Sequence, residues 1–178
     1  MLHDEPMTGY DLKTKCFDRS IAHFWPADQA QIYRTLDKMR ADGWVEFDVQ
    51  EQDGRPDRKV YSLTRAGRDE LRRWVREARA ELPVVREPFL VQLFFAHVLP
   101  DEEARALLED QKRKHEATLA RYEAVPLPPL GTRGMGRPHQ FARMTLDYGL
   151  AHERAAIAWC EACLEHLAER KGRKALLR

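Results

Sequence analysis

Cysteine is scarce in this sequence: the 178 residues contain three, Cys16, Cys160 and Cys163. An odd number of thiols with no signal peptide ahead of them argues against a secreted disulfide framework. The chain also has no apolar run that approaches the roughly 18 residues a bilayer-spanning helix requires. We therefore expect a protein of the reducing cytoplasm that does not enter the membrane.

A strong net charge is missing as well. The formal net charge is +1 although 33% of the residues are charged. Residues 1–82 hold 15 Lys and Arg against 16 Asp and Glu. Because no global positive field draws the chain to nucleic acid, any affinity for DNA must come from local clusters of cations.

The motifs of enzymes and metal centres are also missing. No glycine-rich phosphate-binding sequence follows a strand, the seven histidines lack the close spacing of metal ligands, and no nucleophile has a recognisable base partner. Cys160-Glu161-Ala162-Cys163 falls deep inside an expected helix, away from the helix N-terminus where a redox pair belongs. We interpret its thiols as core packing and expect neither an enzyme nor a cofactor.

The most informative stretch is residues 27–63, which begins with an amphipathic helix. Asp28 and Gln31 have the spacing of a capping box, and Gly43 supplies a left-handed helix stop. Apolar side chains recur between them at helical spacing: Ile32, Leu36 and Met39. Most polar side chains fall on other faces, where amides and hydroxyls can read base edges and cations can hold phosphates. These candidates are Gln29, Gln31, Arg34, Thr35 and Lys38.

A two-stranded wing is expected next. Residues 45–50 alternate apolar and polar side chains, Asp53-Gly54 is a tight-turn signal, and residues 60–63 return as a second strand. Three cations stand at or beside the tip, where they suit a phosphate backbone: Arg55, Arg58 and Lys59. A helix followed by a hairpin is a common unit, so this geometry alone does not decide for DNA.

A short helix is expected before this stretch, from about Gly9 to Phe17, because Thr8 and Asp11 have capping-box spacing. Tyr10, on its first turn, could pack in the core or donate its hydroxyl to a phosphate, and we favour packing. We expect Trp25 to pack beneath the 28–39 helix, because large aromatic side chains usually bury.

Several motifs occur together in a specific order and spacing. They are Thr8-Gly9-Tyr10-Asp11-Leu12, Phe24-Trp25-Pro26, Gln31-Ile32-Tyr33-Arg34-Thr35-Leu36, Asp42-Gly43, Gly54-Arg55-Pro56, Arg58-Lys59-Val60-Tyr61-Ser62-Leu63-Thr64 and Ala66-Gly67. With them the sequence closely resembles the PadR family of winged-helix transcriptional regulators over residues 6–80. The resemblance implies a homodimer that binds double-stranded DNA, usually as a repressor released by a small aromatic or drug-like effector. It also implies a place close to the DNA for Tyr33, which matches the tyrosine of the family motif.

The beginning of the sequence departs from the family pattern. The family has a helix of about ten further residues before the Thr-Gly-Tyr motif, whereas Met1–Pro6 can hold at most its last turn. We therefore expect apolar surface to be exposed under the winged domain.

Residues 65–82 predict a further helix with an apolar stripe and an arginine-rich surface. We interpret its arginines as a solvated face paired with neighbouring acids rather than as a second phosphate-binding surface. Pro83 then breaks the helix and marks a domain boundary.

Residues 83–178 read as almost all helix. The nearly continuous apolar run at 86–96 must be buried against something, a long helix follows over 100–124, and the longest runs from His139 to about Lys171. Arg86-Glu87-Pro88-Phe89 and Gly149-Leu150-Ala151-His152-Glu153-Arg154 resemble the C-terminal region of longer PadR-type regulators related to virulence activators. This resemblance implies a helical dimerisation domain.

The aromatic residues of this half have two open interpretations: an effector pocket between the winged domain and the helices, or ordinary core and dimer interface. They are Phe89, Phe94, Phe95, Tyr148 and Trp159.

The expected fold is mainly α with a small β-wing. A winged helix-turn-helix over residues 1–82 precedes a helical dimerisation and possible effector domain over 83–178. The expected function is binding to an inverted-repeat operator. The alternative is a winged-helix protein-interaction module that no longer binds DNA, which the slightly acidic balance and the short N-terminus support.

Overall fold

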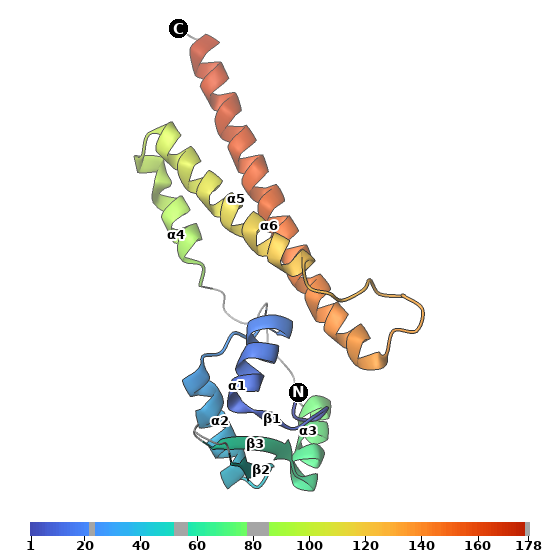
Figure 1. Ribbon diagram of the computed structural model, residues 1–178. Coiled ribbons are helices and arrows are strands. Elements are labelled where there is room, and N and C mark those ends of the chain that lie inside the picture. The colour runs from blue at the N-terminus through green and yellow to red at the C-terminus, as the bar shows by residue number, and fades with distance from the viewer. Residues whose placement is uncertain (22–23, 52–56, 78–85, 177–178) are drawn as a thin grey trace. The chain divides into compact units, whose positions relative to one another are not determined.

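The computed structural model describes residues 1–178 except 22–23, 52–56, 78–85 and 177–178. The chain divides into two compact units, Met1–Leu82 and Pro83–Arg178. The first unit combines helices with a three-stranded sheet, and the second is built from helices (Figure 1). The predicted fold class, mainly helical with a small β-wing, is confirmed. None of the helices in the described ranges is both long and apolar enough to cross a membrane.

The first helical segment begins at the predicted cap and runs further than expected. Helix α1 (Gly9–Asp11) continues without a break as a π-helix, Leu12–Ser20. The capping box is confirmed: the Asp11 amide donates to Thr8 Oγ1 at 3.0 Å, and the Thr8 amide donates to the Asp11 carboxylate at 3.4 Å. The wider turns of a π-helix give no distinct sequence period, which is why the segment was predicted to end three residues early.

Helix α2 (Gln29–Ala41) has the predicted start and stop. The Gln31 amide donates to Asp28 Oδ1 at 2.7 Å, and the Asp28 amide donates to Gln31 Oε1 at 2.9 Å. Ile32 and Leu36 are buried. Gly43 has a φ of 73°, so it adopts the left-handed conformation in which a side chain would be strained.

Both predicted wing strands form, the second beginning at Arg58 instead of Val60, and a third strand joins them. Strands β2 (Val45–Gln50) and β3 (Arg58–Leu63) are antiparallel, with Phe47 opposite Tyr61. The two-residue strand β1 (Met7–Thr8) adds to the other edge of β3, giving the order β1-β3-β2. Two residues are too short for a period of two to show in the sequence. The predicted turn at Asp53-Gly54 lies outside the described residues.

The core of the first unit lies where α2, the π-helix and the sheet meet. Its buried members are Met7, Leu12, Cys16, Ile32, Leu36, Val45, Tyr61 and Leu63. Burial in this core raises the pKa of the Cys16 thiol. Cys16 is therefore a packing residue, in line with the interpretation of the scarce thiols as core side chains.

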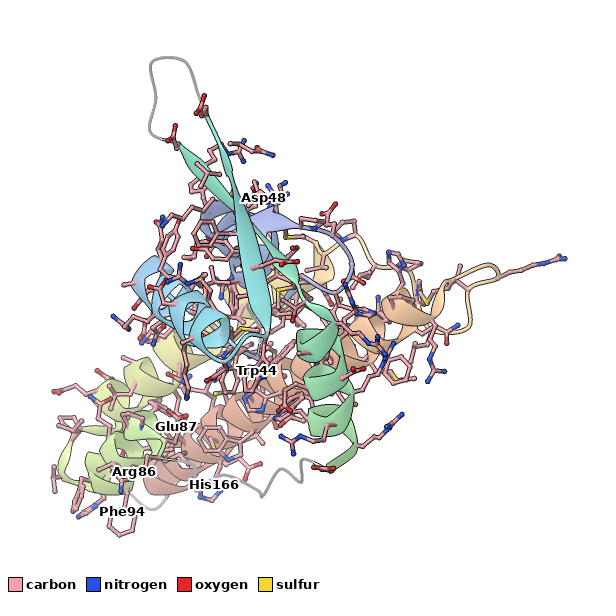
Figure 2. All side chains as sticks on the ribbon, turned by 90° about the horizontal axis from the view of Figure 1, so that it is seen from below. Trp44, Asp48, Arg86, Glu87, Phe94 and His166 are labelled. Atoms are coloured by element: carbon pink, nitrogen blue, oxygen red, sulfur yellow. The ribbon has the colours of Figure 1, made fainter. Side chains whose placement is uncertain are left out.

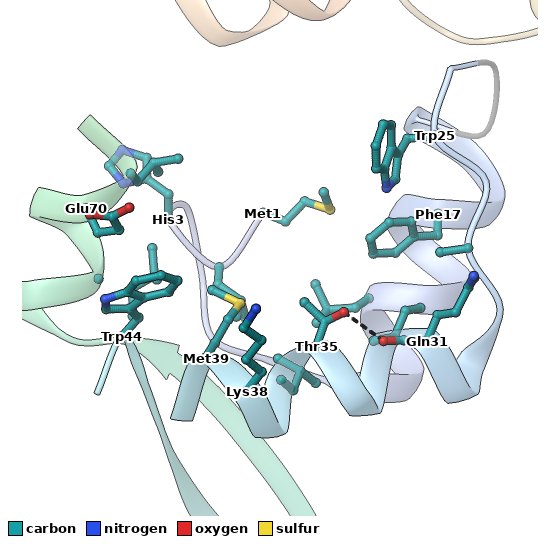
Figure 3. A pocket seen from close by; sticks show the side chains of 18 of the residues that line it. Met1, His3, Phe17, Trp25, Gln31, Thr35, Lys38, Met39, Trp44 and Glu70 are labelled. Atoms are coloured by element: carbon teal, nitrogen blue, oxygen red, sulfur yellow. Dashed lines mark hydrogen bonds between the residues drawn. The ribbon is translucent and has the colours of Figure 1, made fainter. Parts of the chain in front are cut away.

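An apolar groove of about 900 Å³ opens beside this core (Figure 3). The expectation that Trp25 packs beneath α2 is wrong, because its side chain is 66% exposed at the edge of the groove. The apolar stripe of α3 (Arg65–Glu77) is also exposed in this unit, and two of its members, Leu71 and Trp74, line the groove. Apolar surface is thus exposed in the first unit, as the sequence led us to expect.

The arginine-rich surface of α3 is paired with acids along the same helix. Arg73 contacts Glu70 and Glu77, each at 2.6 Å, and Arg72 contacts Asp69 at 3.1 Å. These pairs confirm that the arginines lie beside acids of the same helix, and their solvated role stays a prediction. The start of α3 is capped by Thr64, whose Oγ1 accepts the Gly67 amide at 3.0 Å.

The second unit is a helical hairpin with a short helix before it. Helix α5 (Asp101–Glu123) packs along α6 (Arg137–Leu176), as Figure 1 shows. The 40 residues of α6 span about 60 Å at 1.5 Å per residue. Leu108, Leu146 and Cys160 are almost fully buried, and burial raises the pKa of the Cys160 thiol. This burial confirms the interpretation of Cys160 as core packing.

Polar contacts add to the apolar seam between α5 and α6. His115 Nδ1 lies 2.6 Å from the buried carboxylate of Glu153, and Lys112 lies 2.7 Å from Glu161. Arg154 reaches back to Glu123 at 2.9 Å. The hairpin is therefore fixed in register by contacts that connect specific positions of the two helices.

The apolar run at 86–96 forms α4 (Pro88–Phe95), which leads into a 3-10 turn, Ala96–Val98. Within the single chain Ala96 is buried but most of the large side chains of the run are exposed, so its expected burial against a partner surface stays a prediction. Phe94 projects outward from the helix in Figure 2. Helix α4 contacts α5, and its Phe89 ring meets Trp159 of α6, while Phe94 and Phe95 are more than half exposed.

Candidate DNA interface

The candidate reading helix, α2, is held at its start by the first helical segment. Tyr33 lies across Gly9: a Cβ atom added at Gly9 would stand 2.6 Å from the Tyr33 ring. A side chain at position 9 would therefore displace the ring. Because the glycine of the Thr-Gly-Tyr motif has no side chain, the Tyr33 ring can pack against it where α1 and α2 meet.

Two of the predicted base-reading residues lie at the groove. Gln31 and Thr35 line it together with Lys38 (Figure 3). Both polar groups already have partners in their own helix, because Gln31 Oε1 accepts the Asp28 amide and Thr35 Oγ1 donates to the Gln31 carbonyl at 2.8 Å. Their contact with DNA stays a prediction.

The remaining candidates on α2 face the solvent. Gln29 and Arg34 are exposed, and Tyr33 is exposed on the turn between them. Since Ile32 and Leu36 point into the core, the helical period places Arg34 on the opposite, outward side. Side chains on that side can reach a groove of DNA without disturbing the core.

Two cations, Lys59 of the wing and Arg40 of α2, lie over one aromatic ring of the wing. Lys59 Nζ lies 4.8 Å from the centre of the Phe47 ring, and the Arg40 guanidinium lies 5.4 Å from it. Such contacts are worth about 0.5–1 kcal/mol at exposed sites and limit the directions that a flexible cation explores. Arg40 was missed at the sequence level, since a contact between a helix and a strand leaves no local signal.

A second group of cations gathers around Asp11. Its Oδ2 lies 3.2 Å from the Arg58 guanidinium, and its Oδ1 lies 3.0 Å from Lys15 Nζ. The hydrogen bond from the Thr8 hydroxyl, at 2.6 Å, is the main reason why the pKa of Asp11 is lowered to about 2, and Lys15 lowers it further. Lys15 was not predicted as a site residue, although its four-residue spacing from Asp11 is that of a helical ion pair.

Two further residues of the first unit, Tyr10 and Arg55, were predicted to contact DNA. Tyr10 is 61% exposed beside Asp11, so the preference for core packing is wrong and its hydroxyl is accessible to a partner. Arg55 lies outside the described residues.

The aromatic side chains of the second unit form two pairs. The rings of Phe89 and Trp159 meet edge to face at 6.3 Å, and those of Phe94 and Phe95 at 5.1 Å. Tyr148 is 74% exposed on α6. Phe89 also borders a cavity of about 480 Å³ between α4 and α5, together with Glu87 and Lys114. The structure therefore does not gather the five residues into one cluster within this unit.

The histidines and carboxylates in the described part of the chain form no group of three that could hold a metal ion. Around α2 and the wing the described surface carries amide, hydroxyl and cationic side chains, with carboxylates such as Asp37 and Asp48 among them. Such side chains bind and orient a partner, and DNA is the partner that fits a helix and a wing of this kind.

Comparison with known proteins supports this interpretation in both halves of the chain. Residues 1–73 match the PadR-like family of transcriptional regulators, and residues 85–168 match the family described as virulence activator alpha C-term. The negative transcriptional regulator PadR of Bacillus subtilis is 27% identical over 92% of this chain and 91% of its own length. A probable transcriptional regulator of Mycobacterium tuberculosis is 47% identical over 43% of this chain and 40% of its own.

Solved structures agree over nearly the whole length. Bacillus subtilis PadR in complex with operator DNA has a TM-score of 0.81 and 26% identity, covering 93% of this chain and 94% of that one. The Vibrio cholerae virulence activator AphA has a TM-score of 0.71 and 28% identity, covering 95% and 94%. The relatives are transcriptional regulators, which agrees with the expectation that the protein is not an enzyme. The chain is thus similar to the PadR-like family of transcriptional regulators over residues 1–73, and to PadR and AphA over nearly its whole length.

Proposed function

We propose that the protein is a sequence-specific regulator that binds double-stranded DNA through its first unit. The observation that carries the proposal is the arrangement of α2, whose core side is buried, whose outward side is polar, and whose neighbouring wing holds directed cations. The likeness to a PadR structure bound to operator DNA supports the same use of this surface.

Within this surface we assign reading and holding to different residues. Base edges are read from α2 by Gln29, Gln31 and Thr35. Phosphates and flanking positions are contacted by Tyr10, Tyr33, Arg34 and Lys38, and by Arg55, Arg58 and Lys59 of the wing. Amide and hydroxyl side chains suit the first task because they can donate and accept, whereas cations suit the second.

The protein acts as a homodimer, with dimerisation in the second unit. The support is the exposed apolar surface of α4 and α6 in the single chain. Two copies related by a twofold axis would present two α2 helices to half-sites about one DNA turn apart, that is, to an inverted repeat.

The regulatory outcome is repression, released by a small aromatic effector. The support is the relative named as a negative transcriptional regulator, together with the structure of Bacillus subtilis PadR in complex with p-coumaric acid, which has a TM-score of 0.75. An effector would act here by changing the separation of the two α2 helices. The aromatic pairs Phe89–Trp159 and Phe94–Phe95 are the candidate contacts.

Selection of bound DNA from a random pool, followed by sequencing, tests the function directly. We expect an inverted repeat whose half-sites are about ten base pairs apart. Affinity for this site should exceed affinity for random DNA by at least a factor of about 10³ at physiological salt. Recovery of no preferred sequence, with no measurable binding to any duplex, would overturn the proposal and favour a protein-interaction module.

A further inference from the structure

The carboxylate of Asp11 lies among cations on a surface that we assign to DNA, where a negative charge should weaken binding. Its side chain is 17% exposed, while its two partners, Lys15 and Arg58, are 61% and 44% exposed. Each carboxylate oxygen contacts one cation: Oδ1 forms an ion pair with Lys15, and Oδ2 forms one with Arg58. Asp11 is therefore the least exposed of the three side chains, and both cations that contact it are more open to the solvent.

The acid is fixed more firmly than an ordinary surface carboxylate. Thr8 donates its hydroxyl to Asp11 Oδ2 at 2.6 Å, and the Asp11 amide donates to Thr8 Oγ1 at 3.0 Å. Thr8 is itself buried and belongs to β1, which pairs with β3. The carboxylate is thus held by the same strand pair that carries Arg58 at the start of β3.

Arg58 and Asp11 are 47 residues apart in sequence, so their ion pair connects the tip end of strand β3 to the start of the first helix. A free arginine side chain explores many rotamers, and fixing it costs conformational entropy. An arginine already directed by a carboxylate has lost part of that freedom before DNA arrives.

We propose that Asp11 is a positioning residue for DNA binding: it presents Arg58, at the tip end of β3, and Lys15 as a preformed pair of phosphate contacts. The inference rests on the proposed function and adds Lys15 to its contacts. The two cations and the one carboxylate together give the site a net charge of +1. A phosphate that approaches the exposed sides of both cations completes the charge balance.

A positioning role for Asp11 and simple electrostatics predict opposite effects on DNA affinity when the Asp11 carboxylate is removed. Removing a carboxylate near a polyanion should strengthen binding if charge alone decides. If Asp11 positions Arg58, Asp11→Asn should weaken binding about 5- to 10-fold on every duplex tested. The salt dependence should change too, because a lost phosphate contact reduces the slope of log affinity against log salt by about one unit.

The experiment is a double-mutant cycle on the full-length protein, with binding to the selected operator and to random DNA measured over a range of salt. The variants are Asp11→Asn, Arg58→Ala and the two combined. Asp48→Asn is the matched control, since Asp48 is an exposed carboxylate of the neighbouring strand β2. Circular dichroism and thermal unfolding of each variant show that the folded fraction during the binding measurement is the same.

The expected result is that Asp11→Asn weakens binding and lowers the salt slope in the unchanged background but has no further effect when Arg58 is already Ala. Asp48→Asn should strengthen binding slightly or leave it unchanged. If Asp11→Asn behaves like Asp48→Asn while the protein still binds its operator, the positioning role is overturned and the proposed function stands. If the unchanged protein binds no DNA, both are overturned.

Discussion

Gln31 shows how one side chain can serve both the fold and the recognition of DNA. Its Oε1 accepts the Asp28 amide at 2.9 Å, which leaves the amide nitrogen as the group that can donate to a base. A bidentate contact with adenine needs both atoms of the amide, so it would require the cap to open. A single donation to a base acceptor is compatible with the cap as it stands.

Substitutions at Gln31 separate these two roles. Gln31→Ala should cost about 1–3 kcal/mol on the preferred operator and little on random DNA, because one base contact is lost. Gln31→Glu keeps the acceptor for the cap but places an anion toward the DNA, so it should bind more weakly than Ala and unfold at no lower temperature. Equal losses on operator and random DNA for both variants would show that Gln31 only holds the helix.

The lowered pKa of Asp11 predicts how acid affects the first unit. A carboxylate whose pKa is about 2 in the folded chain and 3.8 in its unperturbed state contributes stability above about pH 4 that is lost as the pH falls toward 2. The stability difference between the unchanged protein and Asp11→Asn should therefore shrink between pH 5 and pH 2.5. Denaturant unfolding at several pH values measures it, and a difference that stays constant would contradict the assignment.

At the scale of elements, short sequence patterns predicted those features of helices and strands that neighbouring residues determine. The cap at Asp28, the stop at Gly43 and the strand β2 are each set by residues within a few positions, and all three formed as expected, although Val49 of β2 is exposed. The two-residue strand β1 and the cation pair on Phe47 depend on contacts across the fold, and no short window contains them. The exposure of Trp25 was missed for the same reason, since composition cannot show which neighbours are present.

The start of α2 should be sensitive to Asp28. Asp28→Ala removes the acceptor for the Gln31 amide and should lower the free energy of unfolding by about 1 kcal/mol. Asp28→Asn keeps an acceptor at the same place and is the matched control, with a loss of a few tenths of that. Thermal or urea unfolding of the full-length protein checks it, and equal stabilities for Ala and Asn would argue against a working cap.

The wing makes a prediction about salt. Lys59→Ala should weaken binding to operator and random DNA similarly and reduce the salt slope by about one unit, because a phosphate contact carries no sequence information. Arg72→Ala is the control, since Arg72 lies on α3 in a pair with Asp69 and is not assigned to DNA. A salt slope that stays the same in Lys59→Ala but falls in Arg72→Ala would move the phosphate surface from the wing to α3.

At the scale of the whole molecule, we assign DNA binding to one compact unit and dimerisation to the other. A unit that reads DNA needs an exposed polar helix, whereas a unit that pairs two copies needs an exposed apolar face. Each unit shows the feature its role needs: α2 is polar on its outward side, and α4 and α6 carry large apolar side chains that the single chain leaves exposed. The sequence predicted the helices of the second unit, but their uncovered faces become visible only once the fold of one chain is known.

Dimerisation gives the last prediction. Specific interfaces bury about 1,200–2,000 Å² in total, and exposed rings such as those of Phe94 and Tyr148, each 74% exposed in the single chain, are the kind of side chain that forms their centres. We expect the full-length protein to sediment as a dimer at micromolar concentration. The combined change Phe94→Asp and Tyr148→Asp should shift it to a monomer that keeps its helical content, because both side chains are exposed within one chain. Ala117→Asp, an exposed position of α5, should leave the dimer intact. An unchanged protein that sediments as a monomer would place the pairing of half-sites on the DNA itself rather than in the protein.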